Sequence, residues 1–221
     1  MRMIRSLFRR GFVLPAAAVC SLLVPFTAAH AALVNYSFAG SIDGISPALA
    51  PVSGSFQFDN ATGGSSGAYN GAVTGFTITI GGALGYTSSF SSGANAVTIS
   101  QNLPLGGGVV DRWALSTAVS GPELPGTGFT PFNFDLRLDK QGGGLFANTD
   151  LQDPPSLGAV SAARWRLFFE DVNGNPAVFL GSITSLTAVP LPAAVLLFGA
   201  GLISLVGLGA GGLRNLHGSK V

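Results

Sequence analysis

The amino-acid sequence predicts an all-β body, an antiparallel β-sandwich or jelly roll, between a cleaved N-terminal signal peptide and one C-terminal transmembrane helix. Three observations lead to this prediction. Apolar and polar residues alternate in many short runs, clusters of Gly, Pro, Ser and Asn separate these runs, and a long uncharged segment lies near each chain end. Period-two alternation is typical of strands with one buried face, and frequent turn clusters are typical of sandwiches. Between the two ends, no segment has the period of an amphipathic helix.

Charge is scarce and unevenly distributed. Of the 221 residues, 11 are Lys or Arg and 10 are Asp or Glu, so the formal net charge is +1 and only 10% of the chain is charged. Soluble domains average about 25%. Residues 1–31 contribute +4, residues 32–188 contribute five basic and ten acidic residues, or −5, and residues 189–221 contribute +2. The chain has no basic stripe for phosphates, so we expect no nucleic-acid partner.

Residues 1–31 have the three regions of a secretory signal peptide. An arginine-rich start, MRMIRSLFRR, precedes an uncharged run that contains Cys20. Two prolines interrupt this run and argue against a permanent membrane helix. An A-x-A cleavage site follows, formed by Ala29, His30 and Ala31. Cleavage after Ala31 leaves an exported chain without cysteine, so its packed core must hold it together without disulfides.

The body, residues 32–188, has the length of a single domain. The clearest strand is residues 132–139, where Phe132, Phe134, Leu136 and Leu138 alternate with polar residues that form one solvated face. The full set of expected strands is residues 35–38, 55–59, 75–80, 96–100, 113–119, 132–139, 164–170 and 178–186. Short strands in this number, seven to ten in all, predict an antiparallel sandwich or jelly roll.

The C-terminal segment, residues 189–221, has the organisation of a membrane anchor. Residues 193–213 are 21 consecutive uncharged residues, about 31 Å of helix and enough to cross a bilayer. A short tail, residues 214–221, follows with Arg214 and Lys220. By the positive-inside rule this tail is cytoplasmic and the body is exported. Six glycines between 199 and 212 weaken the span, which favours transient membrane residence.

The motif before this span resembles a known sorting signal. It comprises Val189, Pro190, Leu191, Pro192 and Ala193, and residues 189–194 read VPLPAA. Motif, glycine-rich span, basic tail and signal peptide together resemble the VPLPA form of the PEP-CTERM signal of Gram-negative bacteria. The resemblance covers residues 189–221. It implies processing by an exosortase, a membrane-embedded transpeptidase-like enzyme, then placement at the cell surface or outside the cell, in association with exopolysaccharide and biofilm.

The body contains no histidine and no cysteine, which excludes Ser-His-Asp and Cys-His catalysis and histidine-bound metal sites. We therefore assign no catalytic, cofactor-binding or metal-binding residue. Carboxylate pairs remain as the chemistry of a hydrolase, which needs two such groups about 5 to 10 Å apart. The available carboxylates include Asp111, Glu123, Asp135, Asp139, Glu170 and Asp171.

Two further patterns have an ordinary structural interpretation beside a functional one. Residues 171–175 read DVNGN, which is oxygen-rich like a calcium loop, but Asn173-Gly174 between apolar runs favours a type I′ hairpin turn. The body's larger aromatic residues could stack on sugars, but in strand-like runs they are more often core. These residues are Trp113, Trp165, Tyr36, Tyr69 and Tyr86.

The sequence thus predicts a non-enzymatic structural or interaction protein that is exported to the cell surface. The alternatives are a carbohydrate-binding module and, after it, a carboxylate-dependent hydrolase. Exposed aromatic residues on one sheet face would favour carbohydrate binding. A cleft with two suitably spaced carboxylates would favour the hydrolase.

Overall fold

The computed structural model describes residues 33–190, which form nine strands and one short 3₁₀ helix. Each of the eight predicted strands lies within an observed strand, and only the three-residue β3 was not predicted. The elements are β1 (Leu33–Ile42), β2 (Val52–Asp59), β3 (Ala68–Asn70), β4 (Val73–Ile80), β5 (Tyr86–Leu105), β6 (Gly108–Ser120), β7 (Thr130–Gln141), η1 (Leu157–Ala159), β8 (Ala162–Glu170) and β9 (Pro176–Val189).

The targeting segments predicted at the two chain ends lie largely outside the described residues. This applies to the signal peptide with its cleavage site and to the transmembrane helix at residues 193–213. It also applies to Leu191, Pro192 and Ala193 of the motif and to Arg214 and Lys220 of the tail. Within residues 33–190, no helix has the length and apolar character needed to cross a membrane.

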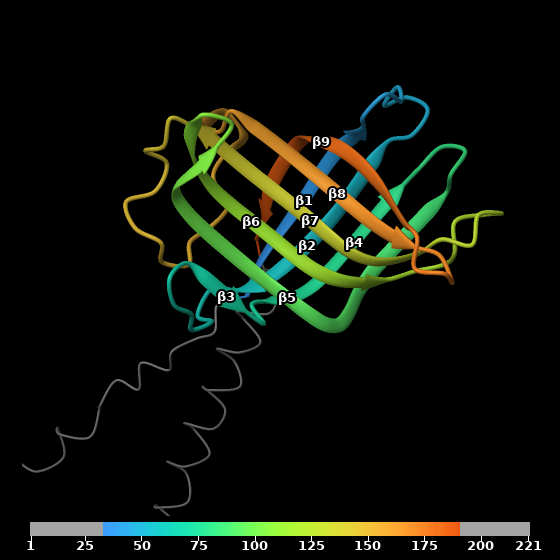
Figure 1. Ribbon diagram of the computed structural model, residues 1–221, viewed down its shortest axis with the longest axis horizontal. Coiled ribbons are helices and arrows are strands. Elements are labelled where there is room, and N and C mark those ends of the chain that lie inside the picture. Colours follow the sequence, from blue (N-terminus) through green and yellow to red (C-terminus); the bar gives the residue numbers. More distant parts are fainter. Residues whose placement is uncertain (1–32, 191–221) are drawn as a thin grey trace, which may run out of the picture. The chain divides into compact units, whose positions relative to one another are not determined.

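The strands form a closed antiparallel barrel, so the all-β prediction is confirmed but the sandwich or jelly roll is wrong (Figure 1). Each long strand pairs with the next long strand along the chain, β1 to β2, β2 to β4, and onward to β9. The last strand then pairs with the first, Asn35 opposite Val189 through Ile42 opposite Gly181. This eight-strand meander has no Greek-key crossing. A closed sheet leaves no long free edge, which a sandwich would have at each sheet.

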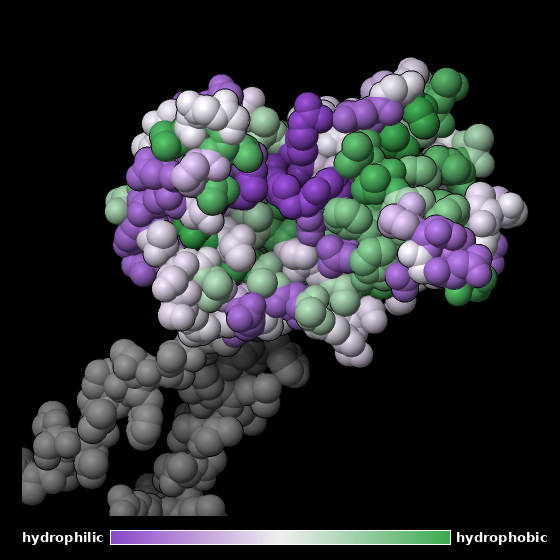
Figure 2. Space-filling model, in the orientation of Figure 1, coloured by the Kyte–Doolittle hydropathy of each residue, from purple (hydrophilic) through white to green (hydrophobic). Residues whose placement is uncertain are grey.

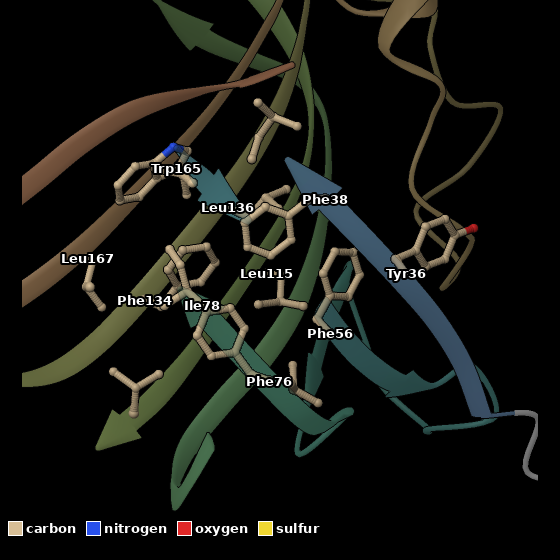
Figure 3. Close-up of a cluster of buried hydrophobic side chains, with 14 of the residues drawn as sticks. Tyr36, Phe38, Phe56, Phe76, Ile78, Leu115, Phe134, Leu136, Trp165 and Leu167 are labelled. Atoms are coloured by element: carbon tan, nitrogen blue, oxygen red, sulfur yellow. The ribbon is translucent and has the colours of Figure 1, made fainter. Parts of the chain in front are cut away.

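Aromatic side chains from opposite walls fill the barrel (Figure 3). Phe134 of β7 lies 4.3 Å from Phe76 of β4 and 6.0 Å from Phe38 of β1, measured between ring centroids. Phe56 of β2 lies 5.9 Å from Trp113 of β6. Eight strands enclose a space that side chains can just fill, and these rings fill it from both sides. The aromatic residues considered above as sugar-stacking candidates are all buried: Tyr36, Tyr69, Tyr86, Trp113 and Trp165.

A β-bulge in β7 reverses the orientation expected for Phe132. Pro131 pairs with Phe169 and Asn133 pairs with Phe168, so Phe132 is the extra residue between them. The alternation of residues 132–139 predicted a buried Phe132, but its side chain is 41% exposed. From Asn133 onward the polar residues face solvent as predicted. A bulge adds one residue to one strand and so turns the following alternation over.

The hairpin predicted at residues 171–175 is confirmed, but its turn is not type I′. That turn needs positive φ at both central residues, and here Gly174 has φ +79 whereas Asn173 does not have positive φ. The backbone N–H of Gly174 donates to the carbonyl of Asp171, and the carboxylate of Asp171 accepts from the N–H groups of Asn173 and Asn175, each at 2.8 Å. These hydrogen bonds lower the pKa of Asp171, the side-chain amide of Asn175 contributing most. The carboxylate oxygens of Asp171, considered above as possible calcium ligands, thus accept hydrogen bonds that hold the turn.

Asp111 at the start of β6 is a buried carboxylate that binds the irregular part of β5 and the segment after β7. It is 1% exposed and accepts backbone N–H groups from Asn102 at 2.8 Å, Leu145 at 2.8 Å and Phe146 at 3.4 Å. Burial raises the pKa of Asp111, but the backbone donors, with Gly144 among them, outweigh this and place the pKa below its ordinary value. The charge therefore stabilises the folded state.

We expect Asp111→Asn to lower the free energy of unfolding by about 1–3 kcal/mol at pH 7, because the amide replaces an acceptor that several N–H groups share. The folded pKa lies below the ordinary 3.8, so this stabilisation is present above that value and is lost as pH falls through the folded pKa. Denaturant unfolding between pH 7 and pH 2 should show a smaller acid loss in the variant. Asp153→Asn, at an exposed position, is the control, and equal acid slopes for D111N and wild type would contradict the assignment.

Gly181 of β9 lies where the barrel closes, and we expect Gly181→Ala to destabilise the fold by about 1–3 kcal/mol through overpacking. A Cβ at this position would overlap the carbonyl oxygen of Ser41 and the indole of Trp165. Gly63→Ala is the control, since a Cβ there meets nothing within 4 Å. Thermal and denaturant unfolding measure both variants. Equal stability of G181A and wild type would show that the closing strands do not pack as described.

Candidate functional site

A cavity of ≈ 190 Å³ lies on the outer face of β6 to β9. We call it the arginine cavity. Its lining comprises Asp43, Arg112, Asp135, Arg137, Asp139, Arg164, Trp165, Arg166, Leu180 and Gly181. Figure 2 shows hydrophilic residues crossing the middle of this face and a hydrophobic area beside them. The charged side chains project outward because they alternate with the buried core residues of β6, β7 and β8.

Two pairs of opposite charge lie directly across from each other in the ladder. Arg112 of β6 faces Asp139 of β7 and donates to it through Nε at 2.7 Å and Nη2 at 2.9 Å. These hydrogen bonds raise the pKa of Arg112 against the opposing effect of burial. Asp135 of β7 faces Arg166 of β8 and accepts a hydrogen bond from it. Such cross-strand pairs are the usual stabilising arrangement on a sheet face.

A third cross-strand pair breaks this pattern. Arg137 of β7 lies opposite Arg164 of β8, and like charges in this position are destabilising. Each has one carboxylate partner to the side: Arg137 donates to Asp135 at 3.1 Å, and Arg164 donates to Asp43 at 3.0 Å. The guanidinium groups retain free N–H donors, because each has five and these two arginines use one apiece in side-chain hydrogen bonds.

The cavity collects most of the body's positive charge. All four arginines of residues 33–190 line it, and Lys140 is the only other basic residue in this range. Four arginines and three aspartates give the cavity a formal charge of +1. The body as a whole is −5, so everything outside the cavity sums to −6. An anionic group approaching the body is therefore favoured here.

Two phenylalanines lie next to the cavity, of which Phe132 is exposed and Phe168 is half-buried. The bulged Phe132 lies 6.1 Å from Phe168 of β8 between ring centroids, and the guanidinium carbon of Arg166 lies 5.0 Å from the centroid of Phe168. Val178 and Leu180 of β9 continue the apolar surface, 43% and 44% exposed. We call Phe132 and Phe168 the phenylalanine pair. Bulges often re-aim a side chain beside a functional site.

The carboxylates considered above for a hydrolase are spread over several parts of the barrel. Asp135 and Asp139 share the cavity, but four residues of one strand separate them, about 13 Å along the backbone. Asp111 is buried and accepts backbone N–H groups. Glu123 accepts the backbone N–H of Gly128 at 2.7 Å. Glu170 ends β8, and Asp171 holds the following turn. In residues 33–190, no cluster of three or more His, Cys, Asp or Glu side chains is placed to hold a metal ion.

The sorting motif is described only at its first two residues. Val189 is the last residue of β9 and pairs with Asn35 near the start of β1, and Pro190 follows it outside the sheet. The two ends of the described chain thus leave the barrel side by side. Gly181 at the cavity and Val189 are eight residues apart on β9, about 26 Å.

Sequence reasoning missed the arginines as a site. The sequence predicts one solvated face for the polar residues at 135, 137 and 139, and Arg164 and Arg166 have the same period. This was the available signal. These residues come together only because of the pairing register of β7 with β8, and this register cannot be read from the sequence. Comparisons with protein-family profiles, curated proteins and solved structures find no match to this chain.

We expect Asp135→Asn to destabilise the fold by about 1–2 kcal/mol, because Asp135 accepts hydrogen bonds from both Arg137 and Arg166. Its loss adds one positive charge to a cavity that already holds a like-charged pair. Added salt should therefore restore part of the stability. Asp43→Asn is the matched control, since Asp43 and Arg164 are 44% and 62% exposed and such pairs contribute about 0–1 kcal/mol. Thermal unfolding measures both variants. Equal losses of stability would show that the hydrogen bonds of Asp135 contribute no more than the exposed pair of Asp43 and Arg164.

Proposed function

We propose that this chain is an exported protein of a Gram-negative bacterium, sorted to the cell surface or matrix by its C-terminal signal, and that its barrel is an interaction module. The observation that supports this proposal is the pairing of Asn35 with Val189. It brings the predicted signal-peptide junction and the predicted sorting motif to the same end of the barrel. The arginine cavity lies on the flank, away from that end.

This arrangement suits a protein that is processed at both ends. Pro190 lies just beyond the sheet, and the described pairing of β9 with β1 ends at Val189. A transpeptidase-like enzyme needs an extended substrate segment, and prolines at 190 and 192 keep their preceding residues extended. Processing there removes nothing from β9, so the barrel stays closed after release or attachment.

Carbohydrate binding is the second candidate function, and one observation favours it. The exposed Phe132 and the half-buried Phe168 form an aromatic pair on the outer face of β7 and β8, with the guanidinium of Arg166 over Phe168. Aromatic surface next to convergent polar groups is typical of ligand sites that take a molecule with both apolar and polar faces. A sugar ring is such a molecule.

Processing at the motif predicts that the surface or medium form of the protein lacks residues 193–221, and we expect the signal peptide to be absent as well. Intact-mass analysis of protein isolated from a host with the sorting enzyme measures both ends. Pro190→Ala with Pro192→Ala should leave the C-terminal segment attached. Pro47→Ala with Pro125→Ala, at two exposed loop prolines, should be processed like wild type. A wild-type protein that still ends at Val221 would refute the sorting proposal.

A further inference from the structure

We infer that the arginine cavity binds a carboxylate-bearing sugar unit of an acidic polysaccharide, with Arg137 and Arg164 holding the carboxylate. The inference rests on the carbohydrate-binding function proposed above and names its ligand class. It starts from the one unfavourable pair on this face, the two arginines opposite each other on β7 and β8. A ligand carboxylate between them would replace their repulsion with two charge-assisted contacts.

The chemistry of the donors favours a carboxylate. A guanidinium presents its N–H groups as a planar fork that matches a carboxylate in geometry. Arg137 and Arg164 each use only one nitrogen in the side-chain hydrogen bonds of the described residues, and both are at least one-third exposed. By contrast, Arg112 already holds Asp139 through two nitrogens. Arg166 also donates through one nitrogen, but it is less exposed and its guanidinium lies over Phe168. The two facing arginines are therefore the most exposed donors of the cavity.

The charge of the cavity favours a ligand with few negative groups. Three aspartates lie among the four arginines, and the sum is only +1. A polyphosphate or a run of acidic residues would meet these aspartates as like charges. A sugar polymer instead combines a carboxylate with several hydroxyl groups, and hydroxyl groups can donate to the aspartates as well as accept from the arginines.

The phenylalanine pair gives the ligand a second point of contact. Arg164, Arg166 and Phe168 alternate on the outer face of β8, so Arg164 and Phe168 are about 13 Å apart along the strand. A ligand that reaches both must extend along β8 over more than one ring. Phe132 is exposed beside the half-buried Phe168, and the apolar face of a neighbouring sugar unit can pack against it.

The test uses the full chain in detergent micelles and oligogalacturonate as the probe, with fully methyl-esterified oligogalacturonate as the neutral ligand of the same sugar. Titration calorimetry should show binding of the acidic form that weakens as NaCl is raised. Arg164→Gln and Arg137→Gln should each weaken it about tenfold or more. Lys140→Gln removes the same charge outside the cavity and should change affinity by less than about twofold. Phe132→Ala should weaken binding of the oligomer and leave free galacturonate unaffected.

The outcomes separate this inference from the proposal on which it rests. Equal binding of the acidic and esterified forms would overturn the carboxylate assignment while leaving carbohydrate binding in place. Absence of binding to both would overturn both. Equally tight binding of polyglutamate would identify an acidic protein as the partner and overturn the sugar assignment. Arg164 is 62% exposed, so Arg164→Gln should retain the wild-type unfolding temperature, and unchanged affinity in this variant would refute the role of the facing arginines.

Discussion

Eight residue pairs between β1 and β9, from Asn35 opposite Val189 to Ile42 opposite Gly181, close the sheet on itself. The other long strands are already neighbours along the chain, so this ladder alone turns an open meander into a barrel. Closure gives the aromatic side chains of β1, β2 and β4 opposing partners on β6 and β7. It also removes the two edges that an open sheet would expose. The ladder joins residues about 150 positions apart, so it carries a loop-closure cost that the packed interior must offset.

The same closure gives the two faces of the wall separate roles. Inward positions are occupied by Phe, Trp, Leu and Ile, which leaves no charged residue but Asp111 buried in the described barrel. Apart from Asp111, the charges of β6 to β8 are therefore confined to the outer wall, where neighbouring strands bring several of them within hydrogen-bonding distance. A protein with few charges can still concentrate them when strand register aligns the polar positions of adjacent strands. The arginine cavity is the result of this alignment.

Local patterns were enough to predict the strands but not their closure. Alternation located all eight long strands, because each buries one face and exposes the other. The sandwich prediction was wrong because the pairing of β1 with β9 joins distant parts of the chain, and no local sequence pattern indicates it. Phe132 was misplaced for a similar reason, since a bulge depends on the partner strand as much as on the residues that form it. The facing arginines were visible as residues, but their opposition follows from the register between β7 and β8.

The position of Val189 in the closing ladder has a mechanical consequence. β1 begins and β9 ends at the same end of the barrel, so a force that separates these two ends loads the ladder one pair at a time and opens it like a zipper. A force between the C-terminal end and a ligand on the flank is transmitted along β9 and β8, whose hydrogen bonds are loaded together in shear. A body attached at its C-terminal end and holding a polymer through β8 is thus loaded in its stronger direction.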